Sequence, residues 1–143
     1  MKIVTSRFGE IEIDKRLAIH FPGGLPGFPE HKEFAILEHK TGSPFCWLQS
    51  LTHPDLAFVM TDPNIVLPDY LSELPPEEKY FFHQEGNTED IVVFAFVTIP
   101  PGKAKEATVN LLGPIVINTK SGTGKQVILS NSRYNHRHPL IPA

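Results

Sequence analysis

The sequence has one cysteine, no long apolar run and no excess of basic charge, and each absence excludes a class of protein. With Cys46 as its only cysteine, the chain can form no internal disulfide, which agrees with a reducing cytoplasm. No apolar run approaches the ~18 residues that a transmembrane helix needs, and Met1–Arg7 lacks the apolar segment of a signal peptide. A net charge of −3 argues against broad nucleic-acid binding and favours a cationic partner. We therefore expect a cytoplasmic protein that binds neither membrane nor nucleic acid directly.

Long helices are also unexpected, because fourteen prolines are spread along the chain. A chain of 143 residues fits one domain over residues 1–143. A domain of that size buries roughly two-thirds of its surface around a single core. The composition therefore predicts one β-rich domain with short elements.

Two β-branched runs are the strongest strand signals. Asn110–Asn118 and Lys125–Leu129 flank the segment Thr119–Gly124, whose two glycines accept positive φ, so we expect an antiparallel hairpin. Pro114 cannot donate to a ladder and is expected at an edge, a bulge or the strand's start. Apolar spacing at i, i+3, i+4 and i+7 predicts one short helix over Leu67–Leu74. Further strands are expected at Lys2–Thr5, Glu10–Ile13, Arg16–Phe21, Glu33–Glu38, Phe45–Leu51, Leu56–Thr61 and Ile91–Ile99.

Three patterns look like catalytic or metal sites and do not have the required spacing. Ser121–Lys125 resembles the end of a Walker A loop, but Gln126 stands where Ser or Thr should bind magnesium, and a strand follows. His136 and His138 face the same way on an extended segment, yet the sequence places no third zinc ligand beside them. Cys46 lacks the signature of an activated nucleophile and is interpreted as a small buried hydrophobe. The residues predict no catalytic group, no metal and no cofactor, which favours a binding or regulatory module over an enzyme.

The segment Phe21–Pro29 contains three glycines and three prolines in nine residues. Such a loop is rigid and tightly turned, and it lacks both the G-x-G-x-x-G spacing and the lysine of a phosphate loop. The prolines direct Leu25 and Phe28 either onto the core or onto a partner. Because a preorganised loop loses little entropy on binding, an interaction role is expected here.

Short motifs follow one another in a fixed order along almost the whole chain. They are Arg7, Gly9 and Ile11; Leu25-Pro26-Gly27-Phe28; Pro44-Phe45; Leu48-Gln49-Ser50; Asp62-Pro63; Tyr70; Asn110–Asn118; Gln126-Val127; Tyr134; and Arg137-His138-Pro139. In this order and spacing the chain resembles the family of the bacterial flagellar assembly factor FliW. Gly113 departs from the alanine expected in many members, which should alter strand flexibility more than function.

The resemblance implies an all-β fold, a small antiparallel β-barrel-like single domain with one short helix, and a role without catalysis. FliW-type proteins bind flagellin in the cytoplasm and, when flagellin is scarce, bind the translational repressor CsrA. By resemblance, the chain would be a chaperone-like CsrA antagonist that couples the flagellin level to flagellin translation. Its net-acidic surface suits a basic RNA-binding partner, and exposed β edges suit addition of an extended flagellin segment.

The surface that binds these partners is expected at the rigid loop and at the segment Phe45–Gln49. The predicted partner-binding residues are Leu25, Pro26, Gly27, Phe28, Phe45, Gln49, Asp62 and Tyr70. Each also has a structural interpretation: the loop residues hold a turn, Phe45 fills the core, and Asp62 caps Asn64. Two other classes of function stay open: a small-molecule-binding or enzymatic barrel that uses its mouth, and an oligonucleotide-binding barrel, which needs a basic groove.

Overall fold

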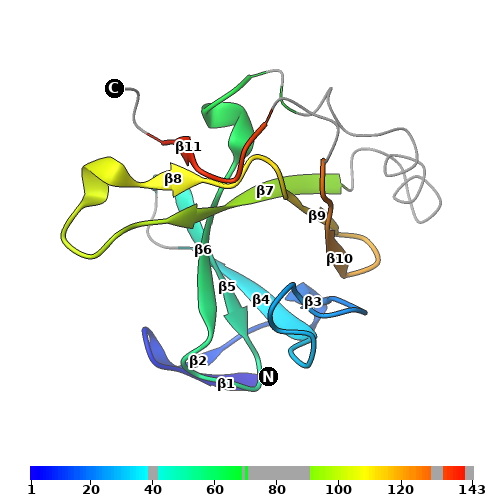
Figure 1. Ribbon diagram of the computed structural model, residues 1–143. Coiled ribbons are helices and arrows are strands. Elements are labelled where there is room, and N and C mark those ends of the chain that lie inside the picture. The colour runs from blue at the N-terminus through cyan, green and yellow to red at the C-terminus, as the bar shows by residue number, and fades with distance from the viewer. Residues whose placement is uncertain (39–41, 69, 71–90, 130–133, 141–143) are drawn as a thin grey trace.

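The computed structural model describes residues 1–38, 42–68, 70, 91–129 and 134–140, and their regular structure is almost entirely strand (Figure 1). The helix expected at Leu67–Leu74 falls mainly on residues outside these ranges. Short 3₁₀ turns occur at Lys15–Leu17 (η1), Pro63–Ile65 (η2) and Ala104–Glu106 (η5). The strands are β1 (Lys2–Thr5), β2 (Gly9–Glu12), β3 (Ala18–His20), β4 (Glu33–Glu38), β5 (Phe45–Ser50), β6 (Ala57–Thr61), β7 (Ile91–Thr98), β8 (Thr108–Val109), β9 (Ile115–Asn118), β10 (Thr123–Gln126) and β11 (His138–Pro139).

Seven of these strands close into a barrel. Strands β3, β4, β5, β6 and β7 are successive antiparallel neighbours, β7 also pairs with β9, and β9 pairs with β10. The ring closes where β10 meets β3 in parallel, through the single residue pair Thr123 and His20. The His20 N–H donates to the Gly122 carbonyl at 2.7 Å at the same point. The predicted all-β, barrel-like fold is confirmed.

The remaining strands extend the barrel at two places (Figure 1). The β1–β2 hairpin, whose two strands were predicted, packs Ile3 and Ile13 against Ala35 of β4 in a small core of its own. At the other end, β8 continues the sheet from β7, and β11 pairs with β8 through His138 and Val109. The C-terminal segment 134–140 therefore docks on the barrel.

Two larger cores stabilise the domain. Side chains fill the barrel interior: Ile19, Phe21, Leu25, Phe34, Leu48, Met60, Ile115 and Ile117 form one buried cluster. A second cluster lies on the other face of β7 and β9, beneath β8 and the C-terminal segment, with Tyr70 and Tyr134 among its members. Alternation along each strand supplies one face to each cluster, so the barrel is a packed core and not a chamber.

The β9–β10 hairpin was predicted, but its second strand begins earlier than expected, at Thr123 and not at Lys125. The Asn118 side chain accepts from the backbone N–H groups of Lys120 and Ser121, which closes the turn within a few residues. Only Gly122 then needs positive φ (+71°), whereas Gly124 lies in the strand with an ordinary backbone. As expected, Pro114 immediately precedes its strand.

Candidate functional site

The loop between β3 and β4 is held by a tight turn at Leu25–Phe28. The Phe28 N–H donates to the Leu25 carbonyl at 2.7 Å, and the Leu25 N–H donates back at 3.3 Å. Pro26 fixes φ at the second position of this turn and Gly27 has φ of +84°, the combination that a type II turn requires. Gly24 also has positive φ, and a Cβ there would lie 2.6 Å from backbone atoms across the loop. The backbone alone therefore defines the shape of the loop.

The two apolar side chains of this turn point in different directions. Leu25 is 2% exposed and packs inside the barrel. Phe28 is 38% exposed, and its ring lies edge-on to Phe58 at 5.5 Å and to His31 at 6.0 Å. Pro26 and Gly27 are exposed at the tip. Leu25 thus anchors the loop, and the other three residues form its accessible surface.

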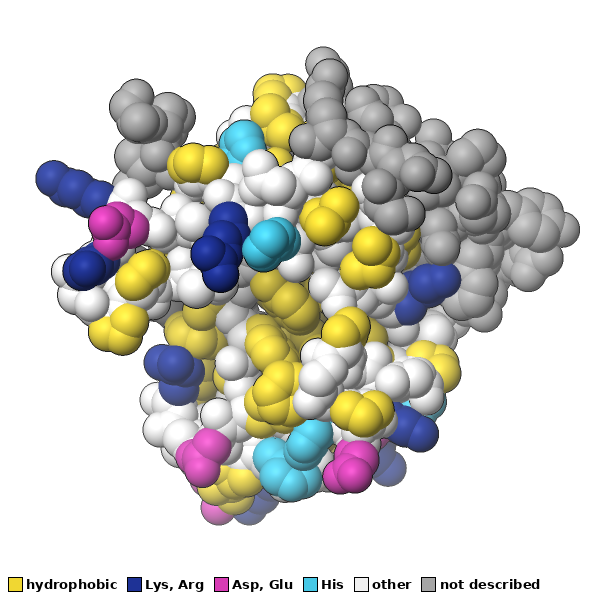
Figure 2. Space-filling model, viewed as in Figure 1, with side chains coloured by type: hydrophobic (Ala, Val, Ile, Leu, Met, Phe, Trp, Pro, Cys, Tyr) yellow, Lys and Arg dark blue, Asp and Glu magenta, His cyan; other side chains and the backbone are white. Residues whose placement is uncertain are grey.

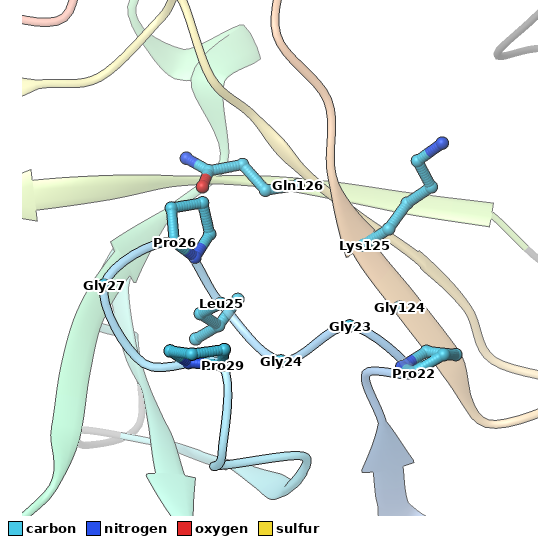
Figure 3. Close-up of a pocket in the computed structure, with 10 residues that line it drawn as sticks. All are labelled: Pro22, Gly23, Gly24, Leu25, Pro26, Gly27, Pro29, Gly124, Lys125 and Gln126. Atoms are coloured by element: carbon cyan, nitrogen blue, oxygen red, sulfur yellow. The ribbon is translucent and has the colours of Figure 1, made fainter.

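A recess of about 520 Å³ lies between this loop and β10 (Figure 3). Most of its wall is proline, glycine and Leu25, so the surface offered is mainly carbon. Figure 3 shows the Lys125 side chain directed away from the loop. The Gln126 amide N–H donates to the Gly113 carbonyl at 2.8 Å. The described residues of this recess include no acid–base pair, and its wall is largely apolar.

Phe45 and Asp62 lie together at a second recess of about 300 Å³. Phe45 is half-buried against the second cluster, the one that contains Tyr70 and Tyr134. Asp62 is exposed, and its carboxylate accepts from the Asn64 backbone N–H at 2.9 Å, which is the capping interaction considered above. Cys46 lines the same recess, and burial raises the pKa of its thiol to about 11. The thiol is therefore protonated near neutral pH, which makes it a poor nucleophile.

Gln49 and Tyr70 are both buried. The Gln49 amide N–H groups point at the backbone carbonyls of Ser50, His53, Pro54 and Leu56, at 3.1–3.4 Å, and so hold the β5–β6 connection. The Tyr70 hydroxyl donates to the Leu111 carbonyl, and its ring lies 4.8 Å from that of Tyr134. Burial raises the pKa of Tyr70, and the neighbouring Tyr134 raises it further, so the hydroxyl stays protonated and can donate. Both side chains support the scaffold from inside.

The predicted residues therefore form three groups: the loop, the Phe45–Asp62 recess and two internal supports. Sequence reasoning missed a further surface, a cleft between β6 and β7 whose wall includes Trp47 and Phe96. The sequence does contain aromatic residues at alternate positions, Phe94 and Phe96. That pattern does not reveal the cleft, because the cleft forms only where β6 and β7 diverge.

No metal centre is found in the described part of the chain, where no group of three or more His, Cys, Asp or Glu side chains could hold an ion. His136 is exposed and His138 half-buried. Within the same residues, no helix is long and apolar enough to cross a membrane.

Comparison with known sequences gives the family. The family profile described as "FliW protein" matches residues 2–140. The chain belongs to the FliW family. A flagellar assembly factor FliW from Natranaerobius thermophilus is 42% identical over 141 residues, covering 99% of this chain and 93% of the relative. Another, from Moorella thermoacetica, is 39% identical over 143 residues, covering 99% and 89%. The resemblance seen in the sequence motifs is confirmed.

A solved structure extends the FliW match to three dimensions. The crystal structure of a protein described as the flagellar assembly factor FliW superposes with a TM-score of 0.87 at 36% identity. The match covers 100% of this chain and 99% of that one. The barrel and its attached hairpins are therefore the FliW fold.

Proposed function

We propose that the chain is a flagellar assembly factor that acts in the cytoplasm by binding other proteins, as a single domain over residues 1–143. The observation that carries this proposal is the family match over residues 2–140, together with relatives that are named flagellar assembly factors. The packed barrel interior supports a role that uses outer surfaces. A preorganised loop with an exposed phenyl ring gives one such surface.

The proposed mechanism is a switch between two partners. The protein binds flagellin while flagellin is abundant, and binds and antagonises CsrA when flagellin has been exported, so that flagellin translation resumes. No catalysis is required, because competition between two binding free energies of comparable size sets the occupancy. The net charge of −3 suits a basic RNA-binding partner and would act mainly on association rate and specificity.

The proposed contact surface is the exposed part of the β3–β4 loop, with Pro26, Gly27 and Phe28 making direct contact. Phe45 and Asp62 form a second contact at their own recess. Leu25, Gln49 and Tyr70 contribute from inside by holding these surfaces in place. Because the loop shape is set by the backbone turn, binding would order few additional torsions.

Isothermal titration tests the switch directly. The protein is titrated with CsrA from the same organism, and the titration is repeated with excess flagellin. Saturable binding that flagellin abolishes is the expected result. Binding to flagellin alone would leave a chaperone-like role without the regulatory arm, and no heat with either protein would contradict the proposal.

The loop surface is tested by Phe28→Ala, with Phe8→Ala as the matched control, since both rings are 38% exposed. Phe8 lies in the β1–β2 turn, so it belongs neither to the β3–β4 loop nor to the Phe45–Asp62 recess. Phe28→Ala should weaken binding of at least one partner by about tenfold, equivalent to ~1.4 kcal/mol, while thermal melting changes little. Equal effects of both substitutions on binding, or joint loss of binding and fold, would show that the loop makes no specific contact.

A further inference from the structure

Strands β6 and β7 pair over two residue positions only and then separate. Their ladder consists of Met60 with Phe96 and Thr61 with Ala95, and the next pair in that register, Val59 with Val97, does not form. The opening is a cleft of about 760 Å³. Figure 2 shows it as a hollow in the middle of the surface, lined by hydrophobic side chains. The closed barrel is thus split at one end, between neighbouring strands.

The walls of the cleft are largely apolar. Trp47 of β5 and Val59 of β6, which face each other across the β5–β6 ladder, lie on one side. Val97 and Ile99 lie on the β7 side. Phe58 and Phe96 connect the two strands, with their rings stacked at 4.9 Å and 22°. An apolar segment placed in the cleft would therefore be in contact with aromatic and β-branched side chains on both sides.

The cleft also presents polar backbone groups of β6. The Ser50 N–H donates to the Leu56 carbonyl. In an antiparallel ladder, the N–H and C=O groups of Leu56, Phe58 and Met60 therefore point toward β5. The N–H groups of Ala57 and Val59 accordingly point to the other side, where the ladder with β7 has ended. A strand edge of this kind is a template for pairing with an extended chain.

The rim of the cleft carries more positive than negative charge, although the whole chain is acidic. Arg7 and Arg137 line it together with His136, and Glu106 is the one acidic side chain among the lining residues that the structure describes. Glu106 in turn lies 3.9 Å from the Lys103 amine. The Arg7 guanidinium sits 3.9 Å from the centre of the Trp47 ring, at the mouth of the cleft. Acidic residues at the ends of a bound segment would complement this rim.

We propose that the cleft binds an extended segment of a partner protein, apolar at alternate positions and acidic at both ends, added as a strand along Ala57–Val59. The inference rests on the proposed function only in assuming a protein partner, and it does not depend on which protein that is. A helix would fill the cleft with apolar contacts but leave the backbone groups of β6 without partners. A strand satisfies both.

A synthetic peptide tests the proposal without any natural partner. The probe is acetyl-Asp-Glu-Val-Thr-Val-Thr-Val-Glu-Asp-amide, and Trp47 reports on it, because it is the only tryptophan and lines the cleft. Trp47 emission should change saturably with a Kd below about 1 mM. Hydrogen exchange at the Ala57 and Val59 amides should slow by about tenfold at saturation.

Charge variants test the rim. Arg137→Glu should weaken peptide binding by about fivefold or more at low salt. Replacing the four acidic residues of the peptide by lysine should have an effect of the same size. Lys120→Glu is the matched control, because Lys120 is exposed in the β9–β10 turn and does not line the cleft. It should leave the Kd unchanged.

Four results would overturn the proposal. Two concern the peptide itself: no change in Trp47 emission up to about 1 mM peptide, or binding without slower hydrogen exchange at the Ala57 and Val59 amides. The other two are tighter binding of a helix-stapled version of the peptide, and a dimer in sedimentation that Arg137→Glu converts to monomer. The last two would assign the cleft to a helix or to a second copy of the chain. If the protein binds the peptide as expected but binds neither CsrA nor flagellin, only the proposed function is refuted. If it binds CsrA and flagellin but not the peptide, only the strand site is refuted.

Discussion

Gly124→Ala isolates one packing contact, between β10 and the Phe21 ring at the start of the β3–β4 loop. Gly124 is buried in β10, and its backbone has no positive φ that would strain a side chain. A Cβ at this position would lie 2.8 Å from Cζ and 2.9 Å from Cε2 of Phe21. Phe21 is fully buried, edge-on to Phe34 at 5.5 Å, and immediately precedes the loop. The glycine is therefore required by lack of space and not by backbone conformation.

The cost of the substitution follows from this geometry. To reach ordinary van der Waals contact, the Phe21 ring must move by roughly half an ångström inside a packed core. Adding one methyl group to such a core costs about 1–3 kcal/mol. For a chain of this length, that lowers the melting temperature by about 3–10 °C.

Urea and thermal unfolding followed by circular dichroism measure this effect, with Gly23→Ala as the matched control. Gly23 lies two residues after Phe21 in the same loop, has an ordinary φ, and has no atom within 4 Å of the added Cβ. It should change stability by less than about 0.5 kcal/mol. Combining Gly124→Ala with Phe21→Leu should recover part of the stability that Gly124→Ala loses. If Gly124→Ala is as stable as the parent protein, the core around Phe21 is not close-packed and the reasoning fails.

Three further predictions concern two buried polar side chains and the half-buried thiol of Cys46. Tyr70→Phe leaves the Leu111 carbonyl without its side-chain donor and should cost about 1–3 kcal/mol in urea unfolding; an unchanged midpoint would contradict the buried hydrogen bond. Gln49→Glu places a carboxylate against four carbonyl oxygens, which raises the folded-state pKa of that acid, so stability should fall as pH rises above about 4.3; equal urea midpoints at pH 5 and pH 7 would refute this. Cys46, with its pKa raised to about 11 from 9.0, should react with a thiol reagent at pH 8 about 100-fold more slowly when folded than in urea; equal rates would show that the thiol is accessible and unperturbed.

Most strands could be predicted from local pattern, because alternation and β-branched residues are local properties. Glu33–Glu38 forms a strand with the predicted bounds. The strand expected at Arg16–Phe21 is shorter, because η1 takes up Lys15–Leu17 and leaves only Ala18–His20 for pairing. The early start of β10 follows from Asn118 side-chain bonds that a periodicity argument does not include. Closure of the ring through β3 and β10 needs tertiary information that no local pattern contains.

The candidate site was predictable in part for the same reason. Proline and glycine spacing predicts a rigid turn at Leu25–Phe28, and the structure has one. The spacing does not decide that Leu25 points inward and Phe28 outward, since that depends on where the barrel wall lies. The cleft between β6 and β7 was beyond sequence reasoning, because it arises where a long-range register ends.

The single-pair closure of the barrel has a consequence for how the chain folds during synthesis. Strands β3 to β6 are consecutive hairpins, so they can form as soon as residues 18–61 are available. Among the described residues, their β3 edge is covered by Gly122 and Thr123, about one hundred positions later in the chain. The growing polypeptide therefore passes through a state with an uncovered sheet edge, which invites aggregation until β10 arrives. Slow translation between these segments should lengthen the lifetime of that state and increase the need for chaperones.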